Sequence, residues 1–91
     1  MPTLVLYNST VQAITATHTD HRVLGDPQLI ACTSVADATT KLQTALAPLV
    51  GSGNATTHAN AFNARQTANS ALSTHVMNFG NGQGATATYR P

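Results

Sequence analysis

The clearest candidates for chemistry are two histidines and an aspartate in the stretch His18-Thr19-Asp20-His21. Imidazole nitrogens and a carboxylate oxygen are ligands that a zinc ion accepts. On a strand, residues three positions apart point to opposite faces, so only a turn would bring His18 and His21 together. The sequence offers no second cluster of ligands for the same ion. We therefore expect a solvated turn and assign no metal ligand, and keep a small metal-binding protein or enzyme using His18, Asp20 and His21 as an alternative.

Two short stretches are similar to motifs of known enzyme families. His18-Thr19-Asp20-His21 resembles the second half of the H-x-H-x-D-H zinc motif of the metallo-β-lactamase fold, but Ala16 stands at the position of the first His and that fold needs a far longer chain. The ligands of the family are therefore not transferred. Removal of Met1 would place the amine of Pro2 before a strand, which is similar to the tautomerase superfamily. That family continues with a helix, whereas this sequence continues with a second strand.

Other groups that could support catalysis are scarce. The sequence has no Glu, and its three Asp residues stand in cap or turn contexts, which leaves few general bases. Cys32 lies in an apolar run and is expected to be a buried thiol. The alternating glycines of Gly80-Asn-Gly-Gln-Gly84 are neither preceded by a strand nor followed by a helix, as a phosphate-binding loop requires, so they predict a hinge. We expect no enzymatic activity, no catalytic residue and no cofactor.

The composition favours a protein that associates with copies of itself. Only 8% of its 91 residues are charged and the net charge is +1, which disfavours nucleic acid as the main ligand. Aromatic residues make up 4% of the chain and many apolar residues are small, so one copy builds only a thin core. No apolar run is long enough to span a membrane. We expect a single domain over residues 1–91.

The first third of the sequence predicts strands. Residues 3–7, 11–19 and 28–33 are rich in β-branched and apolar side chains. Asn8-Ser9 is typical of a turn, which predicts that the first two strands form an antiparallel hairpin. Gly25-Asp26-Pro27 is a second turn signal and separates the third strand from the second.

The middle of the sequence predicts two helices. Ser34 and Asp37 have the spacing of a helix start, and apolar residues recur at intervals of three and four after them. Because Pro48 lacks a backbone N–H, we expect this helix to cover about residues 35–47. A second helix is expected over about 56–79. The glycine-rich loop Gly51-Ser-Gly53 would fold the two into an αα-hairpin, so the fold class is α+β with a small antiparallel sheet.

The predicted second helix has two faces for packing. Spacings of four and three connect Phe62, Leu72, Val76 and Phe79, which we expect to anchor the packing or an interface, together with Tyr89. A seam of small residues, with Ala61, Ala64 and Ala68, is expected to meet the first helix. On one helix His58 and His75 would lie roughly 25 Å apart, too far to share an ion. Residues 80–91 are expected to be a short extended segment that either completes the sheet or forms a flexible, partner-binding arm.

These features together favour a non-enzymatic structural subunit. A surface with few charges is weakly repelled by copies of itself, which suits a homo-oligomer that also contacts other structural proteins. Such subunits occur in virions, as the coat, decoration or tail proteins of viruses and bacteriophages. A soluble cytoplasmic adaptor that binds one protein partner is the further alternative.

Overall fold

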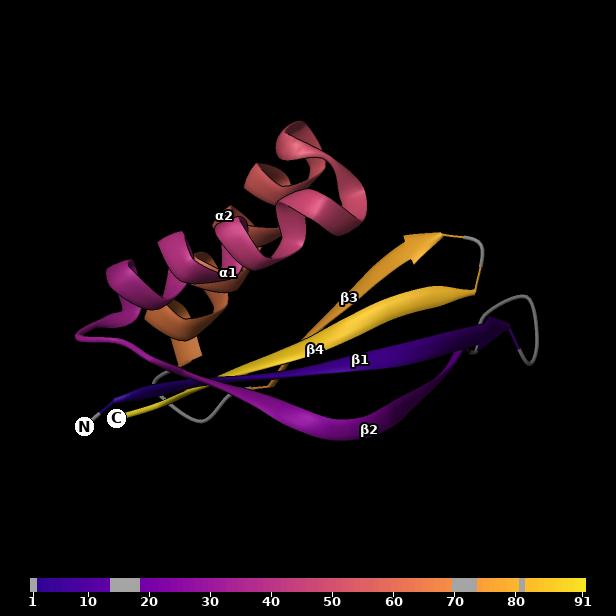
Figure 1. Cartoon of the computed structure of the whole chain (residues 1–91), viewed down its shortest axis with the longest axis horizontal. Coiled ribbons are helices and arrows are strands. Elements are labelled where there is room, and N and C mark those ends of the chain that lie inside the picture. The colour runs from indigo at the N-terminus through magenta and orange to yellow at the C-terminus, as the bar shows by residue number, and fades with distance from the viewer. Residues whose placement is uncertain (1, 14–18, 70–73, 81) are drawn as a thin grey trace.

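The computed structural model describes the backbone of residues 2–13, 19–69, 74–80 and 82–91, and the side chains of 2–9, 26–68, 74–80 and 82–91 (Figure 1). Its elements are, in chain order, β1 (Thr3–Ala13), β2 (Thr19–Ala31), α1 (Val35–Val50), α2 (Ser52–Asn69), β3 (Thr74–Gly80) and β4 (Gln83–Arg90). The expected α+β class, with an antiparallel sheet and a helical hairpin, is confirmed.

The four strands form one antiparallel sheet in the order β2-β1-β4-β3. The first strand and the last therefore lie side by side in its middle, with Leu4 opposite Tyr89. Figure 1 shows both helices on the same face of this sheet. The core lies between the two layers, and the opposite face of the sheet carries no helix in the described part of the chain.

The three N-terminal strands predicted from the sequence are two longer strands. Asn8, where we expected a turn, instead pairs with Leu24 of β2 and Ala85 of β4. Strand β1 has a neighbour on each side, and this pairing overrides the local turn preference of Asn8-Ser9. The turn residues Gly25-Asp26-Pro27 lie within β2, where the register against β1 is irregular. They form a bulge in a continuous strand instead of ending it.

Helix α1 begins where the sequence indicates. The backbone N–H of Asp37 donates to Oγ of Ser34 at 3.1 Å, and Oδ2 of Asp37 accepts from the backbone N–H of Thr33 at 2.9 Å. Asp37 also pairs with Lys41 one turn later at 2.8 Å, and these donors lower the pKa of its carboxyl group, the Lys41 hydrogen bond most. Ser34 and Asp37 together satisfy backbone groups that the helix itself leaves unpaired.

We predict that Ser34→Ala lowers the free energy of unfolding by about 0.5–2 kcal/mol, because the N–H of Asp37 loses its acceptor. Urea denaturation followed by circular dichroism measures this change. Ser34→Asp restores an acceptor at the same position and should recover most of the loss. Equal destabilisation by both substitutions would contradict the capping role.

The end of α1 differs from the expectation, because the helix continues past Pro48 to Val50. Because Pro48 has no backbone N–H, the helix lacks one backbone hydrogen bond in its last turn. Leu46 before Pro48 is fully buried, and the N–H of Gly51 donates to the carbonyl of Ala47 at 2.9 Å to close the last turn. Packing of this turn on the core therefore outweighs the proline.

The predicted second helix over 56–79 is wrong at both ends. Helix α2 begins at Ser52 and ends at Asn69, and residues 74–80 form β3. Exposure alternates along β3, with His75 and Met77 buried and Val76 exposed, which is the period of a strand. The spacing of Val76 and Phe79 imitated a helical stripe, although β-branched and aromatic residues favour strands. Leu72 lies outside the described residues.

The seam between the two helices also differs from the prediction. The seam residues expected from the sequence, Ala61, Ala64 and Ala68, are all exposed. The buried residues of α2 are instead Ala55, Ala59, Phe62 and Gln66. The side of α2 that meets α1 is fixed by two hydrogen bonds. One joins Gln43 to Thr56 at 2.9 Å and the other joins Thr39 to Asn63 at 3.3 Å.

The C-terminal segment is not an arm. It forms β4, which pairs with β1 on one side and β3 on the other. Ala85, Ala87 and Tyr89 of β4 lie in the buried cluster under the helices. The hairpin from β3 to β4 turns at Gly80 and Gly82, whose φ angles of 83° and 77° favour glycine, so these residues form a tight turn and not a hinge.

Candidate interaction surface

The face of the sheet away from the helices is defined by strand parity and register. Leu4 and Leu6 pack in the core under the helices, so the alternate residues Val5 and Tyr7 of β1 point to the other face. Residues directly opposite one another on neighbouring strands share a face. Leu29 of β2 is opposite Val5, so it also points away from the helices.

The same parity extends across β4 and β3. Val5 is opposite Thr88, Tyr7 is opposite Thr86, and Thr86 is opposite Val76. We call this surface the open face; its described residues are Thr3, Val5, Tyr7, Ser9, Leu29, Ala31, Thr74, Val76, Asn78, Gly84, Thr86, Thr88 and Arg90.

The open face is apolar or hydroxylated and nearly uncharged. Leu29 is 66% exposed and Val76 52% exposed, one on each outer strand. The hydroxyl groups of Thr74 and Thr88 lie 3.2 Å apart, which pairs them across the strands. Among the residues of this face that the structure describes, Arg90 alone carries a charge. Such a surface fits another apolar surface better than it fits an ionic ligand.

Two apolar runs in the sequence could have predicted that this face is apolar. An antiparallel sheet with one wet face alternates apolar and polar residues along each strand. Leu4-Val5-Leu6-Tyr7 of β1 and Leu29-Ile30-Ala31 of β2 do not alternate. Unbroken apolar runs are typical of strands covered on both faces, whereas here the helices cover only one.

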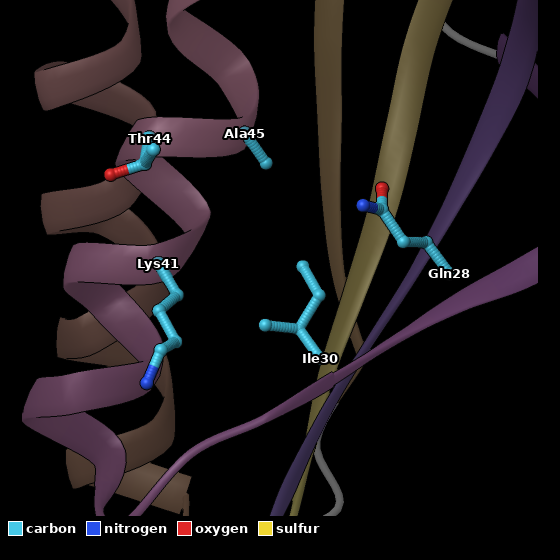
Figure 2. Close-up of a pocket in the computed structure, with 5 residues that line it drawn as sticks. All are labelled: Gln28, Ile30, Lys41, Thr44 and Ala45. Atoms are coloured by element: carbon cyan, nitrogen blue, oxygen red, sulfur yellow. The ribbon is translucent and has the colours of Figure 1, made fainter.

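A cleft of about 440 Å³ lies on the helix side of the sheet, between α1 and β2 (Figure 2). Ile30 and Ala45 form its apolar part, and its other lining residues are Gln28, Lys41 and Thr44. No carboxylate, imidazole or thiol is among these lining residues, and the one charged side chain, Lys41, is paired with Asp37 at 2.8 Å.

His58 and His75 lie together between α2 and β3, and not at opposite ends of one helix. The ring of His75 meets Phe62 edge-on at a centroid distance of 6.1 Å, and the ring of His58 meets Phe79 at 5.2 Å. Nδ1 of His75 is buried and has no hydrogen-bond partner among the described residues. Burial is the main cause that lowers the pKa of His75, and the nearby charges of Arg65 and His58 lower it further. This buried imidazole is therefore held neutral.

We predict that the protein loses stability as the pH falls below about 6.5, the ordinary pKa of the imidazole. Above that value His75 is neutral in both states and makes no difference. Below that value His75 is protonated in the unfolded chain but still neutral in the folded chain, so a fall in pH favours unfolding. The loss of stability ends once the pH is below the lowered pKa of His75 in the folded state. Thermal denaturation between pH 7 and pH 5 measures the loss.

The matched variant for this prediction is His75→Leu, because leucine keeps an apolar side chain against Phe62 and does not titrate. Its melting temperature should fall less between pH 7 and pH 5 than that of the original protein. His58→Leu should retain most of the pH dependence. An unchanged pH profile in His75→Leu would assign the effect to other histidines.

The alternative metal site is not brought together by the described residues. His18 lies outside them, and Asp20 and His21 are described only as backbone in β2, opposite Gln12 and Val11. Within the described part of the chain, no group of three His, Cys, Asp or Glu side chains could hold a metal ion. Cys32 is buried as expected, and burial raises the pKa of its thiol, as does Asp37 to a smaller degree.

The five predicted packing residues have different positions. Phe62 and Tyr89 belong to the buried cluster, and Phe79 packs against it while partly exposed. Val76 lies on the open face, away from that cluster. Leu72 lies outside the described residues, and Val76 and Phe79 lie on β3 where the sequence predicted a helix.

Comparison with known proteins adds no assignment. No protein-family model matches the chain, and neither a curated protein nor a solved structure matches it at a significant level. In the part of the chain that the structure describes, no helix is both long and apolar enough to cross a membrane. The open face is thus the feature from which a function can be inferred.

Proposed function

We propose that this protein is a non-enzymatic structural subunit that assembles with copies of itself through the open face. The observation that carries the proposal is the unbroken apolar run Leu4-Val5-Leu6-Tyr7, whose alternate members point to a face without helices. A strand of this composition is suited to burial on both sides. Val5 is only 6% exposed within one copy. The second layer from another molecule would therefore chiefly cover Leu29, Val76 and the partly exposed Tyr7.

The charge and size of the chain support this role. With 8% charged residues, copies of the chain repel one another weakly. The buried cluster contains one Phe and one Tyr, and several of its members are alanines. A core built from such small side chains gives little hydrophobic free energy to offset the entropy lost when each residue is ordered. Burial of the open face between copies would add stability that a single copy lacks.

We further propose that the assembly is a virus or bacteriophage particle, in which the chain is a coat, decoration or tail component. This part rests on composition: a small chain with few charges, rich in Thr, Ala and Asn, is suited to being covered by neighbours on several sides. Particles or tubes in negatively stained electron micrographs of the purified protein would support it. Small discrete oligomers would favour the adaptor role instead.

Light scattering after size-exclusion chromatography tests self-assembly. The protein should form species larger than one copy, and Leu29→Asp should reduce their size by placing a carboxylate on the open face. The matched control is Leu49→Asp, since Leu49 is 60% exposed but lies on α1, on the helix side of the sheet. A protein that stays monomeric at every concentration would overturn the proposal.

A further inference from the structure

The two outer strands of the sheet protect their free edges to different degrees. Strand β2 carries Pro27, Asp26 and an irregular register, features that discourage another strand from pairing with it. Strand β3 has the sequence Thr-His-Val-Met-Asn-Phe-Gly, with no proline and no Lys, Arg, Asp or Glu. In the described part of the chain its only neighbour in the sheet is β4. An unprotected edge of this kind is suited to pairing with another strand.

We propose that β3 pairs antiparallel with β3 of a second copy about a two-fold axis, which joins the two sheets into one continuous sheet. This contact lies at the edge of the sheet, beside the open face, and is a second contact between copies. It rests on the proposal that the protein assembles with copies of itself. A two-fold interface uses the same surface on both copies, so the strand must be complementary to itself. Two identical antiparallel strands are complementary to each other when no like charges lie opposite one another, and β3 contains no Lys, Arg, Asp or Glu.

The regular part of β3 sets the register. Pairing with β4 is uninterrupted from Thr74 to Asn78 and shifts only after Asn78. The middle of this stretch is Val76, so pairing that uses all of it places Val76 opposite Val76 of the second copy. Thr74 then lies opposite Asn78 of the second copy, and no charged pair arises. Facing β-branched side chains are favourable cross-strand neighbours.

The helix side of β3 is compatible with this pairing. In the proposed register His75 lies opposite Met77 of the second copy, and both residues are already buried under α2. The helix-covered layer thus continues across the axis. Val76 on the other side is 52% exposed, and a second strand beside it removes part of this apolar surface from water.

Helix α2 lies beside β3, and one of its sides is turned away from α1. Thr56 and Asn63 face α1, and His58 contacts Phe79 on a different side of the helix. At 100° per residue, Ala61, Arg65 and Ala68 lie on the side of α2 away from α1, and all three are exposed. The charged Arg65 therefore limits how closely α2 of the second copy can approach, and the proposed contact rests on the strands.

Engineered cysteines test the pairing and its register. The Val76→Cys variant should form a disulfide-linked dimer under mild oxidation, because the two copies lie directly opposite one another. Thr74→Cys is the matched control on the same face of the same strand. Its two copies would lie four residues apart along the strands, roughly 14 Å at 3.4 Å per residue, and should not crosslink. Native Cys32 is only 1% exposed and does not compete.

A mixture of Thr74→Cys and Asn78→Cys should also crosslink, whereas each variant alone should not. This mixture carries the same test if Val76→Cys fails to fold. Crosslinking of Thr74→Cys alone, or no crosslinking of Val76→Cys in a protein that still assembles, would overturn the β3 pairing and leave the structural role standing. A monomeric original protein in light scattering would overturn both.

Discussion

Truncation of residues 83–91 leaves a chain without a cooperative fold. This segment is β4, which lies between β1 and β3, so its removal separates the N-terminal hairpin from the rest of the sheet. An isolated two-stranded hairpin is marginally stable in water at best. The buried side chains of Ala85, Ala87 and Tyr89 are lost with it. Far-UV circular dichroism during heating should show no sigmoidal transition.

The matched control removes only Arg90 and Pro91, both of which are exposed. It leaves most of β4 paired, so its melting temperature should stay near that of the full chain. A truncated chain that kept a cooperative transition and lost only self-assembly would contradict the central position of β4. It would restore the role of an arm that the glycines at 80–84 suggested.

Phe62→Ala is expected to lower the free energy of unfolding by about 3–5 kcal/mol, the cost of emptying a fully buried aromatic site. Phe62 is 0% exposed, lies on α2, and its ring contacts His75 of β3. At roughly 0.05–0.15 kcal/mol per residue, the stability of a chain of this length is about 5–14 kcal/mol. The substitution therefore removes a large share of it, and the melting temperature should fall by more than about 12 °C.

Two substitutions calibrate this result. Leu49→Ala changes an exposed residue of α1 and should alter the stability by no more than about 0.5 kcal/mol. Phe79→Ala should have an intermediate effect, because Phe79 is only partly buried against the core. Denaturant titration of the three variants gives the order directly. Equal effects of Phe62→Ala and Leu49→Ala would mean that α2 does not pack on the sheet.

Local signals in the sequence predicted some elements well. Ser34 and Asp37 predicted the start of α1 to the residue, because a cap depends on side chains within one turn of each other. The apolar spacing from Val35 onward predicted the buried positions Ala38 and Leu42, but it also assigned Leu49 to the buried stripe, and Leu49 is 60% exposed. Gly51 correctly indicated the turn of the helical hairpin, whereas Ser52 and Gly53 of the predicted loop belong to α2.

Signals that depend on distant partners failed. A turn at Asn8-Ser9 was reasonable locally, but β1 gains a neighbour from the other end of the chain, which the sequence does not reveal. The alternation of β3 was hidden because Val76 and Phe79 continued the spacing of Phe62 in α2. The sequence left residues 80–91 open as a strand or an arm, because their pairing partner β1 lies at the other end of the chain.

The sequence predicted self-association but did not locate a surface for it. Low charge and a thin core indicated self-association, and this reasoning needs no structure. The surface itself depends on which strand faces have no helix, so Leu29 could not be singled out while its partner Val5 was unknown. Val76 was named for its place on a helical stripe, and it instead lies on an outer strand.

The neighbouring positions of the first and last strands have a consequence for synthesis on the ribosome. Thr3 pairs with Arg90, at nearly the full length of the chain from it. The nascent polypeptide cannot close its sheet until β4 has been synthesised, so folding is governed by a late, long-range step. We expect chains that stop before β4 to remain unfolded, and so to be unable to enter the proposed assembly.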